Sequence, residues 1–101
     1  MNMQMIMQQA KKMQAQLQKE QSILENTEYV GTSSMVTIKI NGKYEVLDVK
    51  FSIPDGDELS RDDIEMVEDM FMVAMNDAIK KLTDDKNSKL SKYGQGLAGL
   101  M

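Results

Sequence analysis

The sequence predicts an α+β domain made of a helix, a three-stranded antiparallel sheet and a second helix. The helices are predicted because apolar residues recur at spacings of three and four over residues 3–24 and again over residues 61–82. The sheet is predicted because apolar and polar residues alternate on both sides of an Asn-Gly pair at residues 41–42. At 101 residues, with 42% apolar and 28% charged residues, the chain has the composition of one globular domain. We expect this domain to span residues 1–92 and a flexible C-terminal tail to span residues 93–101.

The first predicted helix is long and amphipathic. Most of its polar positions are Gln or Lys, which are good helix formers, and no Gly or Pro interrupts it. Its apolar stripe is narrow, repeats like a heptad and is rich in methionine. The stripe consists of Met3, Ile6, Ala10, Met13, Leu17 and Leu24, with Glu20 as its one polar position. Two interpretations stay open: a seam that packs in a coiled coil or dimer, and a flexible hydrophobic surface that recognises a partner.

The predicted sheet begins with an edge strand at residues 28–34, in which Gly31 suggests a bulge or a bend. The next two strands flank Asn41 and Gly42. This pair predicts a two-residue type I′ turn, because such a turn requires positive φ at both central residues.

The predicted turn also fixes how the second strand pairs with the third. Counting outwards from the turn places Val36 opposite Leu47 and Ile38 opposite Glu45. The alternating apolar side chains then share one face of the sheet, which we expect a helix to cover. These side chains are Val36, Ile38, Ile40, Leu47, Val49 and Phe51.

A Pro-containing turn ends the sheet, and the second helix is predicted to start near Arg61. Ser60 followed by Asp63 resembles a capping box, and acidic residues in the first turn suit the positive end of the helix dipole. The apolar arc of this helix is wider than the sheet alone can cover. We therefore expect a second copy of the chain to cover the surplus in a homodimer.

We assign the homodimer interface to residues on this second helix. The Asn-Asp pair at residues 76–77 stands inside an otherwise apolar helix, and no nucleophile or base accompanies it. It therefore predicts a polar network that fixes helix packing or the dimer rather than a catalytic pair. The assigned residues are Met70, Met72, Val73, Asn76 and Asp77.

The composition excludes several classes of chemistry. The chain has no cysteine and no histidine, which excludes disulfides, thiol nucleophiles, Cys/His zinc sites and histidine acid-base catalysis. The carboxylates at residues 55–63 lack the spacing of an EF-hand loop, so we interpret them as helix caps rather than a metal site. We expect no enzyme activity, no cofactor and no small-molecule substrate. The sequence shows neither a membrane-spanning run nor a secretory signal, so we expect a cytoplasmic protein without a membrane partner.

The net charge of −4 argues against a nucleic-acid partner, but the charges are unevenly distributed. Residues 1–25 have a balance of +1 and residues 77–101 a balance of +2, whereas the middle of the chain is acidic. The basic residues near the two ends are Lys11, Lys12, Lys19, Lys80, Lys81, Lys86, Lys89 and Lys92. The usual interpretation of such lysines is a solvated helix face.

The chain resembles the YbaB/EbfC nucleoid-associated proteins of bacteria. The resemblance covers most of the chain and rests on several short motifs. The most specific is an Asn-Asp pair inside the apolar second helix, at residues 74–78 (AMNDA). The others are residues 7–14 (MQQAKKMQ), 41–42 (NG), 53–54 (IP) and 67–70 (VEDM). The chain departs from the family pattern in having no proline in its tail.

The resemblance implies a tweezer-like homodimer that binds duplex DNA in the nucleoid with little sequence preference. It implies that lysines on projecting helices form the DNA-binding site, and we assign it to Lys11, Lys12, Lys86, Lys89 and Lys92. These segments contain no arginine, and their one aromatic residue is Tyr93, so we expect contacts to phosphate rather than to bases. The alternative hypothesis is a protein-interaction adaptor that docks a partner through its Met-rich first helix.

Overall fold

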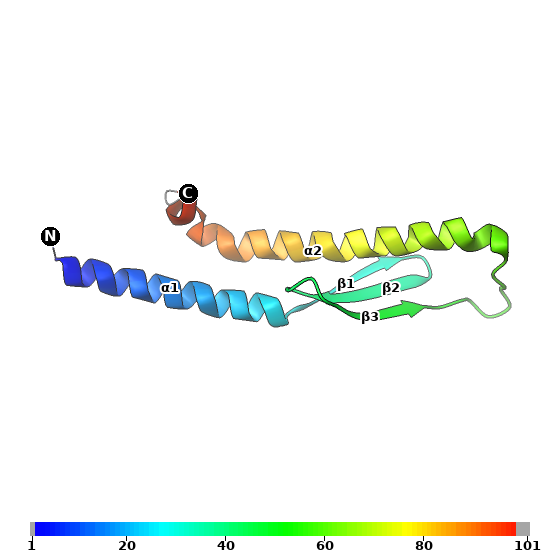
Figure 1. The fold of residues 1–101 in the computed structure, drawn as a ribbon, viewed down its shortest axis with the longest axis horizontal. Coiled ribbons are helices and arrows are strands. Elements are labelled where there is room, and N and C mark those ends of the chain that lie inside the picture. Colours follow the sequence, from blue (N-terminus) through cyan, green and yellow to red (C-terminus); the bar gives the residue numbers. More distant parts are fainter. Residues whose placement is uncertain (1, 99–101) are drawn as a thin grey trace.

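The structure, a computed structural model, describes residues 2–98, with side chains through residue 91. It confirms the predicted α+β fold, with the order helix, three strands, helix (Figure 1). The elements are α1 (Met3–Asn26), β1 (Glu28–Ser33), β2 (Val36–Asn41), β3 (Val46–Phe51), a short 3-10 turn (Arg61–Asp63) and α2 (Ile64–Ala98). The strands form one antiparallel sheet in the order β1-β2-β3.

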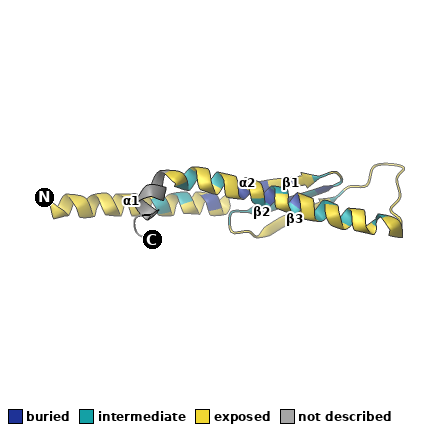
Figure 2. Cartoon of the chain, turned by 90° about the horizontal axis from the view of Figure 1, so that it is seen from above, coloured by how far each residue is buried: buried dark blue, intermediate teal, exposed yellow. Residues whose placement is uncertain are grey.

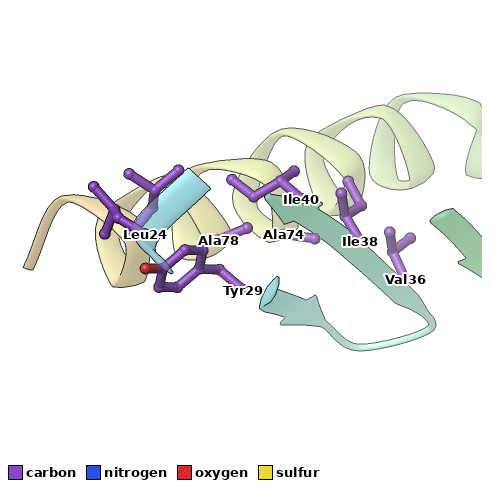
Figure 3. Close-up of a cluster of buried hydrophobic side chains, with 8 residues drawn as sticks. Leu24, Tyr29, Val36, Ile38, Ile40, Ala74 and Ala78 are labelled. Carbon is purple, nitrogen blue, oxygen red and sulfur yellow. The ribbon is translucent and has the colours of Figure 1, made fainter. Parts of the chain in front are cut away.

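The core lies between α2 and the sheet. Ala74 and Ala78 of α2 are fully buried over β1 and β2, and their small side chains allow a close approach (Figure 3). Burying one large aliphatic side chain stabilises a fold by about 1.5–3 kcal/mol. The other buried side chains are Leu24, Tyr29, Val36, Ile38, Ile40 and Leu82.

Gly31 lies opposite Ile38 in a regular part of β1, so the predicted bulge is wrong. A Cβ atom at this position would lie 2.0 Å from the carbonyl oxygen of Ala74 and 2.5 Å from the backbone nitrogen of Ala78. Both distances are far below van der Waals contact. Gly31 therefore allows the backbone of α2 to lie directly against β1.

The loop between β2 and β3 is longer than predicted, so the two-residue type I′ turn is wrong. The N–H of Asn41 donates to the carbonyl of Glu45, and the N–H of Tyr44 donates to the carbonyl of Asn41, both at 3.0 Å. Tyr44 has a φ of 64°, whereas Gly42 does not have positive φ. This is the pattern of a three-residue loop with a left-handed last residue. The Asn41 side chain stabilises it by accepting from the N–H groups of Lys43 and Glu45.

The longer loop changes the pairing of β2 with β3. Val36 lies opposite Phe51 and not opposite Leu47 as predicted. Ile38 lies opposite Val49 and not opposite Glu45. The pairing also changes register between Lys39, which lies opposite Asp48, and Ile40, which lies opposite Val46, as at a β-bulge.

The helix covers only two of the three strands. The backbone of α2 approaches β1 and β2, and β3 lies on the side of the sheet away from it (Figure 1). Leu47 is 48% exposed and Val49 is 47% exposed, so the expectation that a helix covers the apolar residues of both strands is wrong for β3 (Figure 2). Phe51 is partly covered, because its ring stacks on Phe71 with the ring centroids 6.0 Å apart.

The start of α2 agrees with the sequence, because the backbone N–H of Ser60 donates to the Asp63 carboxylate at 2.9 Å, as in a capping box. The helix continues to Ala98, so the expected domain boundary after residue 92 falls inside it. Residues 99–101 lie outside the described residues, and the flexible tail stays a prediction. Within the described part of the chain, neither helix combines the length and hydropathy needed to cross a membrane.

Candidate nucleic-acid interface

Two helical arms extend from one end of the sheet. One arm is α1 and the other is the C-terminal part of α2; they leave the sheet in the same direction (Figure 1). The molecule measures 73 × 21 × 15 Å and has a radius of gyration of 20.3 Å. A compact chain of this length would have a radius of gyration of about 13 Å. The arms therefore present long surfaces outside the core.

The segments furthest from the sheet are basic. Residues 2–19 and 86–98 together carry six lysines and no acidic residue. Of the assigned lysines, Lys11 and Lys12 are exposed on α1 and Lys86 is exposed on α2. These three form no ion pair with the described residues. The side chain of Lys92 lies outside the described residues, although its backbone belongs to α2.

The opposite end of the molecule is acidic. Residues 55–69, which form the loop after β3 and the start of α2, carry eight acidic residues and one arginine, Arg61. This segment and the arm tips lie at opposite ends of the long axis (Figure 1). The charge is therefore separated along the molecule, and an anionic polymer would be attracted to the arms and repelled from the far end. Among the described residues, no group of three or more Asp or Glu side chains is arranged to hold a metal ion.

A polar network at the base of the arms fixes one of the assigned lysines. The hydroxyl of Tyr29 donates to Oδ2 of Asp85 at 2.5 Å, and Nζ of Lys89 lies 3.1 Å from the same oxygen. Burial, together with the hydrogen bond to Asp85 and its charge, raises the pKa of Tyr29 to about 12. The Tyr29 hydrogen bond, aided by Lys89, lowers the pKa of Asp85. Sequence reasoning missed this network because Tyr29 and Asp85 are 56 residues apart.

A second network joins α2 to the outer edge of β1. Oδ2 of Asp77 accepts from the N–H of Thr32 at 3.0 Å, and Nζ of Lys81 donates to the carbonyl of Val30 at 2.8 Å. Asp77 and Lys81 also form an ion pair at 3.3 Å. The hydrogen bond from Thr32, followed by Lys81, lowers the pKa of Asp77. A carboxylate with a lowered pKa stabilises the folded state only while it is ionised. The stabilisation from Asp77 is therefore fully present above the ordinary aspartate pKa, and it is lost as pH falls through the lowered pKa of Asp77.

The residues assigned to the dimer interface differ in their surroundings. Met72 is 58% exposed, Val73 is 51% exposed and Asn76 is exposed. Met70 packs partly against the core, and Asp77 binds the chain's own sheet. Of the Asn-Asp pair, Asp77 thus fixes helix packing within one chain, while the assignment of these residues to a dimer stays a prediction.

The fold and the charge distribution define this chain as a small α+β protein with basic helical arms. The model of the YbaB/EbfC DNA-binding family matches residues 1–97. A nucleoid-associated protein of Clostridium novyi is 37% identical over 99 residues, covering 96% of this chain and 84% of the relative. One from Francisella philomiragia is 40% identical over 89 residues, covering 86% and 77%. The chain belongs to the YbaB/EbfC DNA-binding family, which confirms the resemblance seen in the sequence.

A solved structure shares the fold. The crystal structure of an uncharacterized protein from Helicobacter pylori superimposes with a TM-score of 0.68 and 20% sequence identity. The similarity covers 87% of this chain and 91% of that protein. At this level of identity the likeness supports the fold of the chain.

Proposed function

We propose that this protein is a nucleoid-associated homodimer that binds duplex DNA through the lysines of its helical arms. The observation that carries the proposal is that the acid-free, lysine-bearing segments lie on the arms, at the opposite end from the acidic segment. Neutralising phosphates with lysines releases counterions from DNA, which supplies most of the affinity in non-specific binding. The family and the names of the relatives support both DNA as the partner and the nucleoid as the location.

The contacts should be made mainly to phosphate. Arg61 is the one arginine of the sequence, and it lies in the acidic segment far from the arms. Bidentate readout of guanine in the major groove is most often made by arginine, so the arms lack the usual means of reading base edges. Lysine acts as a point charge on phosphate, which favours binding with little sequence preference.

A homodimer would cover the apolar surface that one chain leaves exposed. This surface includes exposed apolar side chains of β3 and of α2. Its residues are Val46, Leu47, Val49 and Met72, each between 47% and 58% exposed. An isologous dimer would bury each copy's surface and double the number of basic arms.

Replacing Lys86, Lys89 and Lys92 together by glutamine should weaken binding to unrelated duplexes by similar factors. With about four to six phosphates neutralised per dimer, log K for the unchanged protein should fall with log salt at a slope of about −4 to −5. The triple variant should flatten this slope by about two to three. Mobility-shift titrations at several salt concentrations would measure both quantities.

A matched control removes the same charge from the sheet. Replacing Lys39, Lys43 and Lys50 by glutamine changes the net charge equally but leaves the arms intact. On a duplex short enough to hold one homodimer, we expect that variant to keep the slope of the unchanged protein. If the arm variant also kept its affinity and slope, these lysines would not belong to the DNA site, and the adaptor hypothesis based on the exposed methionines of α1 would gain support.

Replacing Leu47 by aspartate should convert the dimer to a monomer. The Leu47 side chain is half exposed in a single chain, so the monomer should stay folded. In the dimer, the aspartate would be buried in an apolar interface without a partner for its charge, which should prevent association. Sedimentation velocity at micromolar concentration would measure the mass, and circular dichroism would report the fold. Val30→Asp is the control, because Val30 lies on the opposite face of the sheet. A dimeric Leu47→Asp variant would rule out this surface.

A further inference from the structure

The outer edge of β3 has the features of a strand-binding site. The N–H of Ser52 donates to the carbonyl of Met35 at 2.9 Å, so the backbone groups of Ser52 face β2. Successive residues of an antiparallel strand direct their backbone groups to alternate sides, so the N–H and C=O groups of Val49 and Phe51 point away from the sheet. No hydrogen bond from the described residues reaches these groups. Such an unpaired edge is a template for another strand.

The other edge of the sheet is closed. The outward-facing N–H of Thr32 and carbonyl of Val30 on β1 are both occupied by side chains of α2, those of Asp77 and Lys81. A strand that added to β1 would have to displace this ion pair. The sheet can therefore grow at β3 and not at β1.

The sequence of β3 is complementary to itself. Asp48 and Lys50 flank Val49, so antiparallel pairing centred on Val49 sets Asp48 of each copy opposite Lys50 of the other. The same register lets Val49 exchange both backbone hydrogen bonds with Val49 of the other copy. A centre on Asp48 or on Lys50 would set like charges directly opposite each other, which disfavours those registers. We propose that two copies of the chain pair through their β3 edges in the register centred on Val49.

This contact differs from the proposed homodimer interface. Asp48 and Lys50 lie opposite Lys39 and Thr37 of β2, on the face of the sheet away from α2. The homodimer would bury apolar side chains on the α2 side, whereas edge pairing uses backbone groups and the charged face. Each homodimer has two β3 edges, so edge pairing joins homodimers into an open chain. The consequence for DNA rests on the proposed function: edge pairing between DNA-bound homodimers predicts that they coat long duplexes cooperatively.

Disulfide trapping tests the register, because the native chain has no cysteine. In the proposed register, residue 48 of one copy and residue 50 of the other form a non-hydrogen-bonded pair with Cα atoms about 4.5 Å apart, within disulfide range. A mixture of Asp48→Cys and Lys50→Cys chains should form a cross-linked species on mild oxidation, and each variant alone should form much less. Absence of the mixed cross-link, or equal cross-linking of each variant alone, would overturn the proposal.

Charge reversal gives an independent measurement. Asp48→Lys should weaken association beyond the homodimer about tenfold, and adding Lys50→Asp to the same chain should restore it. Sedimentation velocity at increasing concentration would measure this association. Equal association of the native chain and the single variant would overturn the proposal. Affinity for a duplex short enough to hold one homodimer should be unchanged in the doubly reversed variant, so a loss of DNA binding in every chain would contradict the proposed function and not the strand pairing.

Discussion

Replacing Gly31 by alanine should destabilise the fold by about 3 kcal/mol, because the added methyl group would overlap the backbone of α2. The nearest atom, the carbonyl oxygen of Ala74, would lie 2.0 Å from the new Cβ. This oxygen belongs to the helix backbone, so no side-chain rotation can relieve the overlap. The helix would have to move away from β1, which would loosen its packing over Ile38 and the rest of the core.

Urea denaturation followed by circular dichroism would measure this loss. Domains of this size are stable by only about 5–15 kcal/mol, so the change would shift the midpoint strongly. Thr32→Ala is the control, since the neighbouring side chain is exposed and its backbone hydrogen bond to Asp77 is retained. A loss of less than about 0.5 kcal/mol for Gly31→Ala, the range of ordinary surface substitutions, would show that α2 does not lie this close to β1.

Replacing Gly42 by alanine should destabilise the fold by about 2–3 kcal/mol. The reason is again close approach, here between the hairpin and the C-terminal end of α1. A Cβ atom at residue 42 would lie 1.9 Å from the carbonyl oxygen of Leu24 and 2.9 Å from Cα of Glu25. Since Leu24 joins α1 to the core, its displacement should also change the direction of the α1 arm.

Gly42→Asn separates this cause from a requirement for positive φ. Asparagine tolerates the left-handed conformation, so it would be accepted if the turn geometry were the reason for glycine. It carries a Cβ atom, so the contact with Leu24 predicts a loss at least as large as that of Gly42→Ala. Denaturant midpoints of both variants would decide between the causes, with Lys43→Ala as an exposed neighbouring control. A stable Gly42→Asn variant would contradict the close-contact explanation.

The sequence by itself determined the elements and the general nature of the surface. Apolar spacing predicted both helices and the strands, because a helix or strand presents its own period whatever packs against it. The capping pair of Ser60 and Asp63 marked the start of the second helix, because both partners lie within one turn. Lysines near both ends of the chain, together with the family motifs, predicted a DNA-binding surface there.

Tertiary structure decided which surfaces those elements cover. The three-residue loop shifted the pairing of β2 with β3. Independently of this shift, α2 leaves β3 uncovered, and no local sequence pattern distinguishes a strand that a helix covers from one that it leaves exposed. Gly31 and Gly42 were assigned to a bulge and a turn, since the backbones that crowd them come from distant parts of the chain. The partners of Asp77 and Asp85 were hidden for the same reason. A side chain's own neighbours in sequence fix its secondary structure, but its partners across 45 or 56 residues are fixed only when the helix docks on the sheet.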